Sequence, residues 1–377
     1  MVLVLVALAA ALVRSSRLTV PTPPRSVAEI APEAAQAAPA LPASPAPGSW
    51  RPFPAPPLEP RSGQAAVWTG DELLLWGGAS EDGVSRRMFR ADGAAMDPAS
   101  DTWRLLPDAE FAPRTDHAAA WAADRLFVWG GTGQAGFLAD GATYDPAEDA
   151  WEALPSGPLS PRTGAAAVWT GGTVVVVGGM DNAGPLTDAA RYDPESGEWT
   201  SLPPLPGGFA EADGVRAAEA DRAVVVWTLD RGGLGSTRIA RLDPAGGGWT
   251  ELPAPPVSDA GLPLLVAGPA TLHALRTSYD GTRADLLTLA DGATAWEERP
   301  APAVLSDPWE AGMWWTGTAV LIADADAGVR YDPATDSWSQ LTDVPPATSP
   351  APPVWTGQDL LRVEPGAEGA AWRPATP

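Results

Sequence analysis

The sequence of 377 residues contains no cysteine. Disulfide bonds, thiolate metal sites and cysteine nucleophiles are therefore excluded. Histidine is scarce too, with two residues, His117 and His273. Basic residues number 24 against 47 acidic ones, which gives a formal net charge of −23. That charge favours solubility and disfavours nucleic acid and anionic membrane surfaces as partners. We expect no nucleic-acid partner.

A long hydrophobic run is also missing. As a helix, the apolar stretch Met1 to Val13 would span only about 20 Å of the roughly 30 Å hydrocarbon core of a bilayer. Its length is typical of a signal peptide, but two arginines follow it and no basic residue precedes it. A start site further upstream would explain this order and would allow a longer anchor.

We interpret residues 1–20 as a hydrophobic signal or membrane-anchor segment. Residues 21–48 are rich in Pro and Ala, which is typical of an extended linker. Residues 49–377 are then the folded part, which we expect to be extracytoplasmic, either secreted or anchored to the membrane.

Tryptophan, in contrast, is abundant, with 18 residues, and it marks an internal repeat. Five times a tryptophan follows the aspartate of an Asp-Pro pair by six residues, at Trp103, Trp151, Trp199, Trp249 and Trp338. The first four are separated by 48, 48 and 50 residues, which is near the length of one four-stranded propeller blade. The repeat predicts an all-β protein.

Each repeat can be divided into four antiparallel strands, A to D. In the second repeat strand A runs from Ala118 to Trp121, strand B from Leu126 to Trp129, and strand D from Trp151 to Leu154. The pair Gly130-Gly131 ends strand B, where a backbone without side chains can turn sharply. Strand C closes on Tyr144-Asp145-Pro146, a combination that favours a turn.

The pattern resembles the Kelch repeat, the propeller class that includes the central domain of galactose oxidase. The resemblance rests on glycine pairs after strand B, tyrosines in strand C and tryptophans in strand D: Gly77-Gly78, Gly130-Gly131, Gly178-Gly179, Tyr144, Tyr192, Trp103, Trp151 and Trp199. It covers residues 49–377, although the later repeats lack the glycine pair. It implies a fold but little about function, because Kelch propellers include oxidases, sugar isomerases and binding proteins.

Seven tryptophans at strand D positions predict a seven-bladed β-propeller: Trp50, Trp103, Trp151, Trp199, Trp249, Trp296 and Trp338. The last blade has strands A to C near Val354-Trp355, Leu360 to Val363 and Trp372, but no strand D after them. The segment Trp50 to Phe53 belongs to no other blade and is the candidate for this strand D. As the outer strand of the last blade, this N-terminal segment should close the ring and leave no sheet edge unpaired. Because repetition implies a structural duty, we interpret most tryptophans as packing between blades rather than as a carbohydrate-stacking surface.

Function is expected on one face of the propeller. The starts of the A strands and the B–C loops share this face, because strands A and B are antiparallel. We call it the loop face. The A–B and C–D turns lie on the opposite face, which we call the turn face. The turns vary little between repeats, whereas the loops vary, so a ligand or partner should bind the loop face around the central channel.

Candidate binding residues lie at the starts of the A strands and in the loops. Arginine recurs as Arg61, Arg114 and Arg162, and a ring of these could bind a carboxylate or sugar acid by bidentate contacts. Alternatively, each arginine pairs with a local acid or carbonyl, which we favour. The other binding candidates are Asp116, His117, Trp309, Glu310 and the basic loop cluster of Arg86, Arg87 and Arg90.

Catalysis finds less support. Asp116-His117 stands where the first repeat has Gly63-Gln64, and a carboxylate beside an imidazole could perform acid–base catalysis, but an isolated loop histidine is more often solvated. The catalytic candidates are therefore His117 and Glu310, and neither is firm. A copper site like that of galactose oxidase requires a cysteine cross-link that this chain lacks. We expect no metal and no cofactor.

The sequence thus favours an exported or membrane-tethered monomer that acts as a binding module for a protein or glycan partner. An alternative comes from a bacterial family of Kelch-like sugar isomerases. It is a cofactor-free epimerase or mutarotase for sialic acid-type sugars, which would need only a carboxylate, an arginine and a histidine.

Overall fold

In the computed structural model, residues 49–374 are described except 82–86, 213, 221, 230–236, 244–247, 257–263, 269, 278–283, 303–310, 325–326, 342–353 and 364. The segments expected at residues 1–20 and 21–48 lie outside the described residues. So do three candidate site residues, namely Arg86, Trp309 and Glu310.

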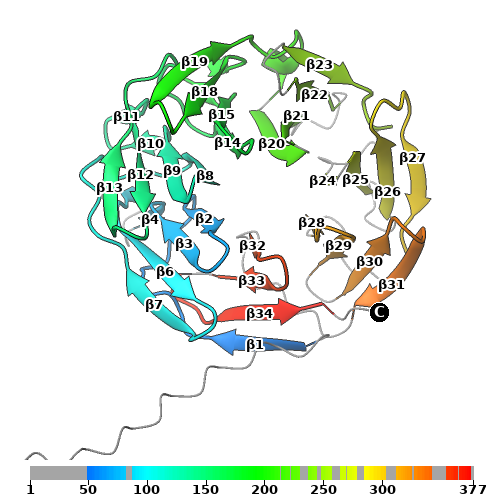
Figure 1. Ribbon diagram of the computed structural model, residues 1–377, viewed down its shortest axis with the longest axis horizontal. Coiled ribbons are helices and arrows are strands. Elements are labelled where there is room, and N and C mark those ends of the chain that lie inside the picture. The colour runs from blue at the N-terminus through cyan, green and yellow to red at the C-terminus, as the bar shows by residue number, and fades with distance from the viewer. Residues whose placement is uncertain are drawn as a thin grey trace, which may run out of the picture. The chain divides into compact units, whose positions relative to one another are not determined.

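Seven four-stranded antiparallel sheets follow one another around a ring, with strand A of each innermost (Figure 1). This is the predicted seven-bladed propeller. The first three blades are β2 (Ala65–Trp68), β3 (Leu73–Trp76), β6 (Gly93–Asp97) and β7 (Thr102–Leu105); β8 (Ala118–Ala122), β9 (Arg125–Trp129), β12 (Gly141–Asp145) and β13 (Ala150–Ala153); and β14 (Ala166–Trp169), β15 (Val174–Val177), β18 (Ala189–Asp193) and β19 (Glu198–Leu202).

The next three blades have the same strand order. They are β20 (Gly214–Ala220), β21 (Ala223–Leu229), β22 (Ile239–Leu242) and β23 (Trp249–Leu252); β24 (Leu264–Gly268), β25 (Thr271–Thr277), β26 (Ala284–Ala290) and β27 (Glu297–Pro300); and β28 (Gly312–Trp315), β29 (Val320–Ala323), β30 (Gly328–Asp332) and β31 (Ser337–Leu341). Among the described residues the one helix is a short 3₁₀ turn, η1 (Phe209–Glu211), and no helix is long and apolar enough to cross a membrane.

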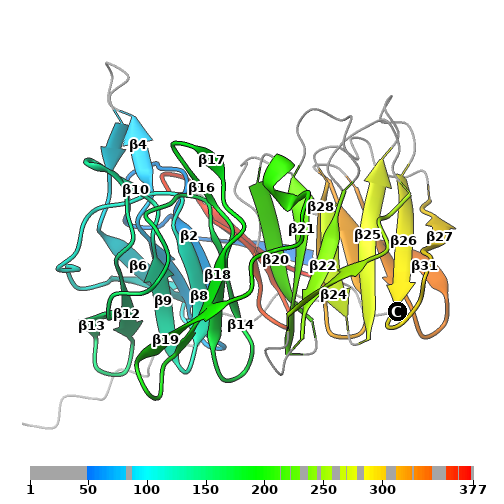
Figure 2. The same cartoon turned by 90° about the horizontal axis from the view of Figure 1, so that it is seen from above.

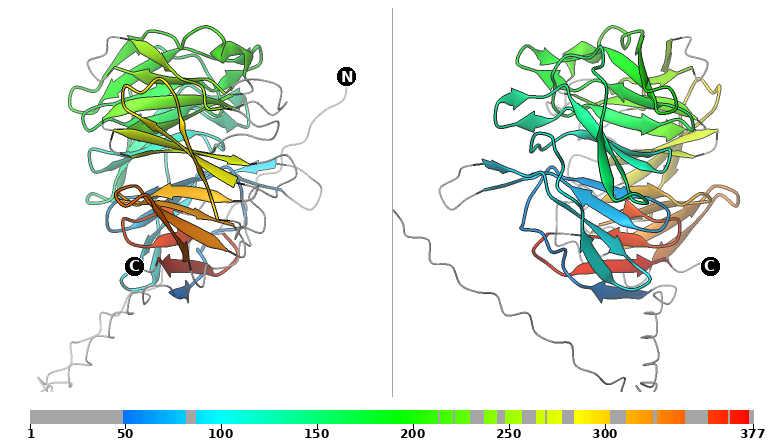
Figure 3. Two further views of the ribbon diagram at one scale, coloured as in Figure 1. Left: turned by 90° about the vertical axis from the view of Figure 1, so that its right-hand side faces the viewer. Right: turned by 60° about the vertical axis from the view of Figure 1, so that its left-hand side comes forward.

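The seventh blade joins the two ends of the propeller. It consists of β32 (Val354–Trp355), β33 (Leu360–Arg362), β34 (Gly369–Arg373) and, as its outer strand, β1 (Ser49–Phe53). Figure 3 shows dark-blue β1 beside red β34, and the register sets Trp50 opposite Trp372. The predicted closure of the ring by the N-terminal strand is confirmed.

The hydrophobic core lies in wedges between neighbouring blades. Between blades 1 and 2, for example, Leu74 and Trp76 of one blade pack with Leu126 and Tyr144 of the next. Corresponding clusters occupy the other six junctions. Burying these side chains stabilises the ring because each blade covers the apolar face of its neighbour.

The strand D tryptophans also connect neighbouring blades through hydrogen bonds. In five of them the indole N–H donates to the carbonyl of a proline that follows the preceding strand D, which for Trp103 is Pro54. The distances are 2.8, 3.1, 3.0, 2.8 and 2.8 Å for Trp103, Trp151, Trp199, Trp249 and Trp296. An amphipathic indole suits this place, because its ring fills the wedge while its N–H finds an acceptor. The repeat tryptophans are thus structural, as predicted.

Three small ribbons extend the B–C connections of blades 1 to 3. They are β4 (Ala79–Glu81) with β5 (Arg87–Phe89), β10 (Thr132–Gly133) with β11 (Gly136–Phe137), and β16 (Met180–Asp181) with β17 (Gly184–Pro185). They rise together on the side of the propeller that we call the loop face (Figure 2). The sequence predicts long loops here but not these ribbons.

Candidate functional site

The glycine pairs shape the loop face at the end of strand B in blades 1 to 3. Gly130 and Gly131 have φ of 69° and 95°, a left-handed region that other residues rarely adopt. A Cβ on Gly131 would lie 2.7 Å from the carbonyl oxygen of Thr115, so a side chain would also collide with the backbone. These glycines let the chain turn into the ribbons that flank the channel.

The inner rim of the loop face is a chain of backbone hydrogen bonds across three blades. The N–H of Asp116 donates to the carbonyl of Gly63, and the N–H of Gly164 donates to that of Asp116, both at 2.9 Å. All three residues have positive φ, which aspartate tolerates better than most side chains. Asp116 therefore takes a glycine position of the repeat and adds a carboxylate to the rim.

The repeated arginines lie beneath this rim and are buried. Arg114 and Arg162 are both 0% exposed, and the guanidinium of Arg162 bonds both carboxylate oxygens of Asp188 at 2.6 and 2.7 Å. Arg162 also donates to the carbonyls of Gly178 and Ser160. Arg61 forms the same bidentate pair with Asp92. Of the two sequence hypotheses, local pairing is the one found, and the open ring of guanidinium groups is wrong.

The exposed member of each pair is the acid. The side chains of Asp92, Asp140 and Asp188 are 47%, 54% and 47% exposed. Burial opposes ionisation of Asp92, but the hydrogen bond and charge of Arg61 outweigh it and hold its pKa below the ordinary value. Arg162 does the same for Asp188. A ligand on the loop face therefore meets the carboxylates of these pairs rather than their guanidinium groups.

His117 lies in the wedge between blades 1 and 2. Its ring packs edge-on against Trp76 with 5.2 Å between centroids, and both ring nitrogens are shielded from water without a hydrogen-bond partner. Burial, and then the charge of Arg114, lower its pKa to about 3, so the imidazole is neutral. Asp116 instead pairs with Arg87 at 3.1 Å. In the described structure the two adjacent residues do not form the acid–base pair that the sequence suggested.

The basic loop cluster is largely neutralised. Arg87 pairs with Asp116, and Arg90 bonds Glu59 and the hydroxyl of Ser80. These pairs connect the β4–β5 ribbon to its surroundings. Arg87 and Arg90 are therefore engaged by acids of this chain.

The loop face also carries exposed apolar side chains that the sequence analysis did not identify. Met88 on β5 and Met180 on β16 are 43% and 38% exposed, and Leu264 at the start of β24 is 37% exposed. The two methionines lie on the ribbons of blades 1 and 3. The sequence signal would have been a methionine placed beside the polar residues of a predicted loop.

No group of three or more potential metal ligands occurs among the described residues. The second histidine, His273, is buried in strand B of blade 5, where its ring nitrogens contact the hydroxyls of Thr271 and Thr288 at 3.2 Å. Its ring stacks on Trp315, and burial followed by the charge of Arg299 lowers its pKa to about 4. His273 is therefore a core residue.

The match to a family model supports the repeat assignment. Residues 48–226 match the family model described as the KLHDC2/KLHL20/DRC7 Kelch-repeats domain. Among solved structures, the one titled "Structure of YjhT" is similar at 15% sequence identity, with a TM-score of 0.49 over 66% of this chain and 86% of that chain. No curated protein matches the sequence significantly. The family match over residues 48–226, together with seven sheets of the same strand order, supports a Kelch-repeat β-propeller.

Proposed function

We propose that this propeller is a binding module whose loop face takes a protein partner with basic and apolar side chains. The observation that carries the proposal is the orientation of the repeated ion pairs, which bury arginine and expose aspartate. Exposed carboxylates on a protein of net charge −23 attract cations and repel sugar acids. A protein partner therefore fits this face better than an acidic glycan.

The methionines add an apolar component to that surface. Met88 and Met180 stand on ribbons of different blades, with Asp116 on the rim between those blades. Methionine adapts its shape readily and is common at binding surfaces. Apolar anchors surrounded by charge are typical of protein interfaces. We therefore place the contact over blades 1 to 3.

The test measures binding of a lysine- and leucine-rich amphipathic peptide to the full-length protein by surface plasmon resonance. Glu81→Lys with Glu110→Lys on the loop-face side should weaken binding about tenfold, because close charge pairs contribute on the order of 1–2 kcal/mol together. The matched control, Asp124→Lys with Glu148→Lys in the turns, changes the net charge equally and should have little effect. Equal losses for the two pairs would mean unspecific attraction and would refute the proposed face.

A second pair of variants tests the apolar component. Met88→Ser with Met180→Ser should weaken binding, whereas Leu105→Ser on an outer strand should not, although Leu105 is more exposed than either methionine. The isomerase alternative has less support, since no carboxylate is in hydrogen-bonding contact with His117 among the described residues. Mutarotation or epimerisation of a sialic acid by the purified protein would nevertheless favour it over binding alone.

We also propose that the propeller works outside the cytoplasm. The support is the apolar segment at residues 1–20, the linker at residues 21–48 and the absence of cysteine. Protease added to intact cells should digest the propeller while a cytoplasmic control protein survives. Protection of the propeller under conditions that cleave a known surface protein would contradict this placement.

A further inference from the structure

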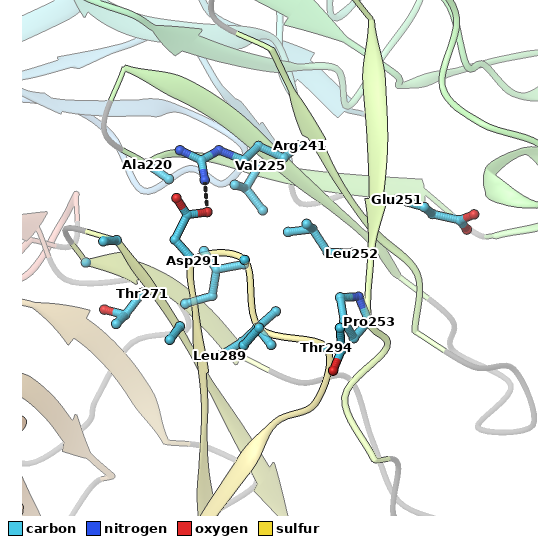
Figure 4. Close-up of a pocket in the computed structure, with 16 residues that line it drawn as sticks. Ala220, Val225, Arg241, Glu251, Leu252, Pro253, Thr271, Leu289, Asp291 and Thr294 are labelled. Atoms are coloured by element: carbon cyan, nitrogen blue, oxygen red, sulfur yellow. Dashed lines mark hydrogen bonds and ion pairs between the residues drawn. The ribbon is translucent and has the colours of Figure 1, made fainter.

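A cavity of about 450 Å³ opens on the turn face between blades 4 and 5 (Figure 4). Its apolar wall includes Val225, Leu252 and Leu289, and its polar wall includes Arg241, Asp291 and Thr294. The volume lies in the range of small-molecule sites, which combine apolar walls with a few polar groups. It is on the face opposite to the proposed partner surface.

The repeat explains why this junction is hollow. In blade 2, Trp121 of strand A and Tyr144 of strand C both lie opposite Leu126 of strand B. Blades 3 and 6 repeat this tryptophan and tyrosine as Trp169 with Tyr192 and Trp315 with Tyr331. In blade 5 the corresponding residues, opposite Leu272, are Ala267 and Leu289. An indole and a phenol are therefore missing from the wedge.

The filled junctions show what chemistry this space accepts. The hydroxyl of Tyr144 donates to Asp149 at 2.7 Å and accepts from Arg104 at 2.8 Å. Between blades 5 and 6 the hydroxyl of Tyr331 donates to Asp336, which also pairs with Arg299. Twice, then, a phenol ring lies in the wedge with its hydroxyl beside an arginine and a carboxylate.

The hollow junction also carries an arginine and a carboxylate, although at other positions of the repeat: Arg241 lies on strand C of blade 4 and Asp291 follows strand C of blade 5. Arg241 donates to Asp291 at 2.6 Å at the edge of the cavity (Figure 4). Thr294, two residues before Trp296, takes the position of Asp149 and Asp336 and contributes a hydroxyl to the wall. An arginine, a carboxylate and a hydroxyl therefore border a cavity that lacks the aromatic rings of the filled junctions.

We propose that the cavity between blades 4 and 5 binds a small hydroxyaromatic molecule. Its ring occupies the space of the missing indole and phenol, and its hydroxyl donates to Asp291 or Thr294. A neutral ligand is favoured over a carboxylate, because Asp291 and Glu251 border the cavity of a strongly acidic protein. The volume exceeds that of one phenol ring, so two fused rings suit it better.

The test uses 2-naphthol as the probe and isothermal titration calorimetry of the full chain. Saturable binding at one site is expected, together with a ligand-dependent rise in melting temperature. Ala267→Trp and, separately, Leu289→Tyr restore the residues that the repeat uses and should weaken binding at least tenfold. Filling the cavity should also raise the melting temperature of the free protein by about 2–4 °C.

Two further variants keep the proposal falsifiable if the larger side chains do not fit. Arg241→Gln leaves the volume of the cavity similar and should weaken 2-naphthol binding several-fold. In a separate comparison, 2-naphthoate should bind the wild type more weakly than 2-naphthol. Leu242→Tyr is the matched control at the tyrosine position of blade 4, where the cavity measures only about 30 Å³, and it should leave binding unchanged. Lack of saturable binding to the wild type, or undiminished binding to the folded Ala267→Trp variant, would overturn the proposal.

Discussion

Removing residues 1–58 is expected to lower the melting temperature by roughly 10 °C, whereas removing residues 1–48 should leave it nearly unchanged. The longer deletion removes β1 and two buried side chains, Phe53 and Leu58. Burial of each such side chain is worth about 1.5–3 kcal/mol, and each kcal/mol shifts the melting temperature by about 2–4 °C in a domain approaching this size. Differential scanning calorimetry of the two deletion variants measures the difference.

The contacts of β1 explain why its loss should affect two blades. Phe53 packs with Leu73 and Met96 of blade 1 and with Leu361 of blade 7. Pro54 accepts the hydrogen bond of Trp103 at 2.8 Å. Without β1, blade 7 exposes an edge of β34, and blade 1 loses part of its wedge.

Point variants in the full chain provide the control for this experiment. Phe53→Ala should lower stability by about 3–5 kcal/mol, because it empties a well-packed site. Trp50→Ala, on the same strand but 46% exposed, should cost much less. Equal melting temperatures for the 1–48 and 1–58 deletions would contradict a role of β1 in ring closure.

The closure could be predicted because it follows from counting repeats. Gly369 to Pro374 aligns with Gly328 to Pro333 of blade 6, which identifies Trp372 as a strand C residue and leaves strand D unfilled. A repeat fixes register as well as order, since each position keeps its place in the blade. The proline acceptors of the tryptophans could not be predicted, because these contacts join residues more than 40 positions apart.

The candidate site was predicted less well than the fold. The repeat located Arg61, Arg114 and Arg162 but gave no direction for their side chains. Their acid partners lie 31, 26 and 26 residues later, in the B–C connections that vary most between repeats. The recurrence of an aspartate 26 residues after Arg114 and Arg162 was a usable signal. Without it, the favoured local pairing of each arginine could be predicted, but not which acid would pair with it.

His117→Phe is expected to make the propeller more resistant to acid. The pKa of His117 is about 3 in the folded protein, against an ordinary value of 6.5. Below pH 6.5 the histidine is protonated in the unfolded chain but stays neutral in the folded one. The free energy of unfolding is therefore highest above pH 6.5 and falls as the pH decreases toward 3. The slope approaches 1.4 kcal/mol per pH unit for this residue. Its removal should therefore add about 2 kcal/mol at pH 5 and little at pH 8, as measured by urea unfolding at both pH values.

Phenylalanine suits the site because neither ring nitrogen of His117 has a partner, while Trp76 supplies an aromatic neighbour. His273 is the matched contrast, with a pKa of about 4 but hydrogen-bonding contacts to Thr271 and Thr288. His273→Phe should also flatten the acid dependence, yet it should lower stability at pH 8 by about 1–2 kcal/mol, since it removes the ring nitrogens that contact these two hydroxyls. If His117→Phe loses stability between pH 7 and pH 5 as steeply as the wild type, His117 is accessible to protons in the folded state. The wedge between blades 1 and 2 would then be open enough for His117 to serve the acid–base role that its burial argues against.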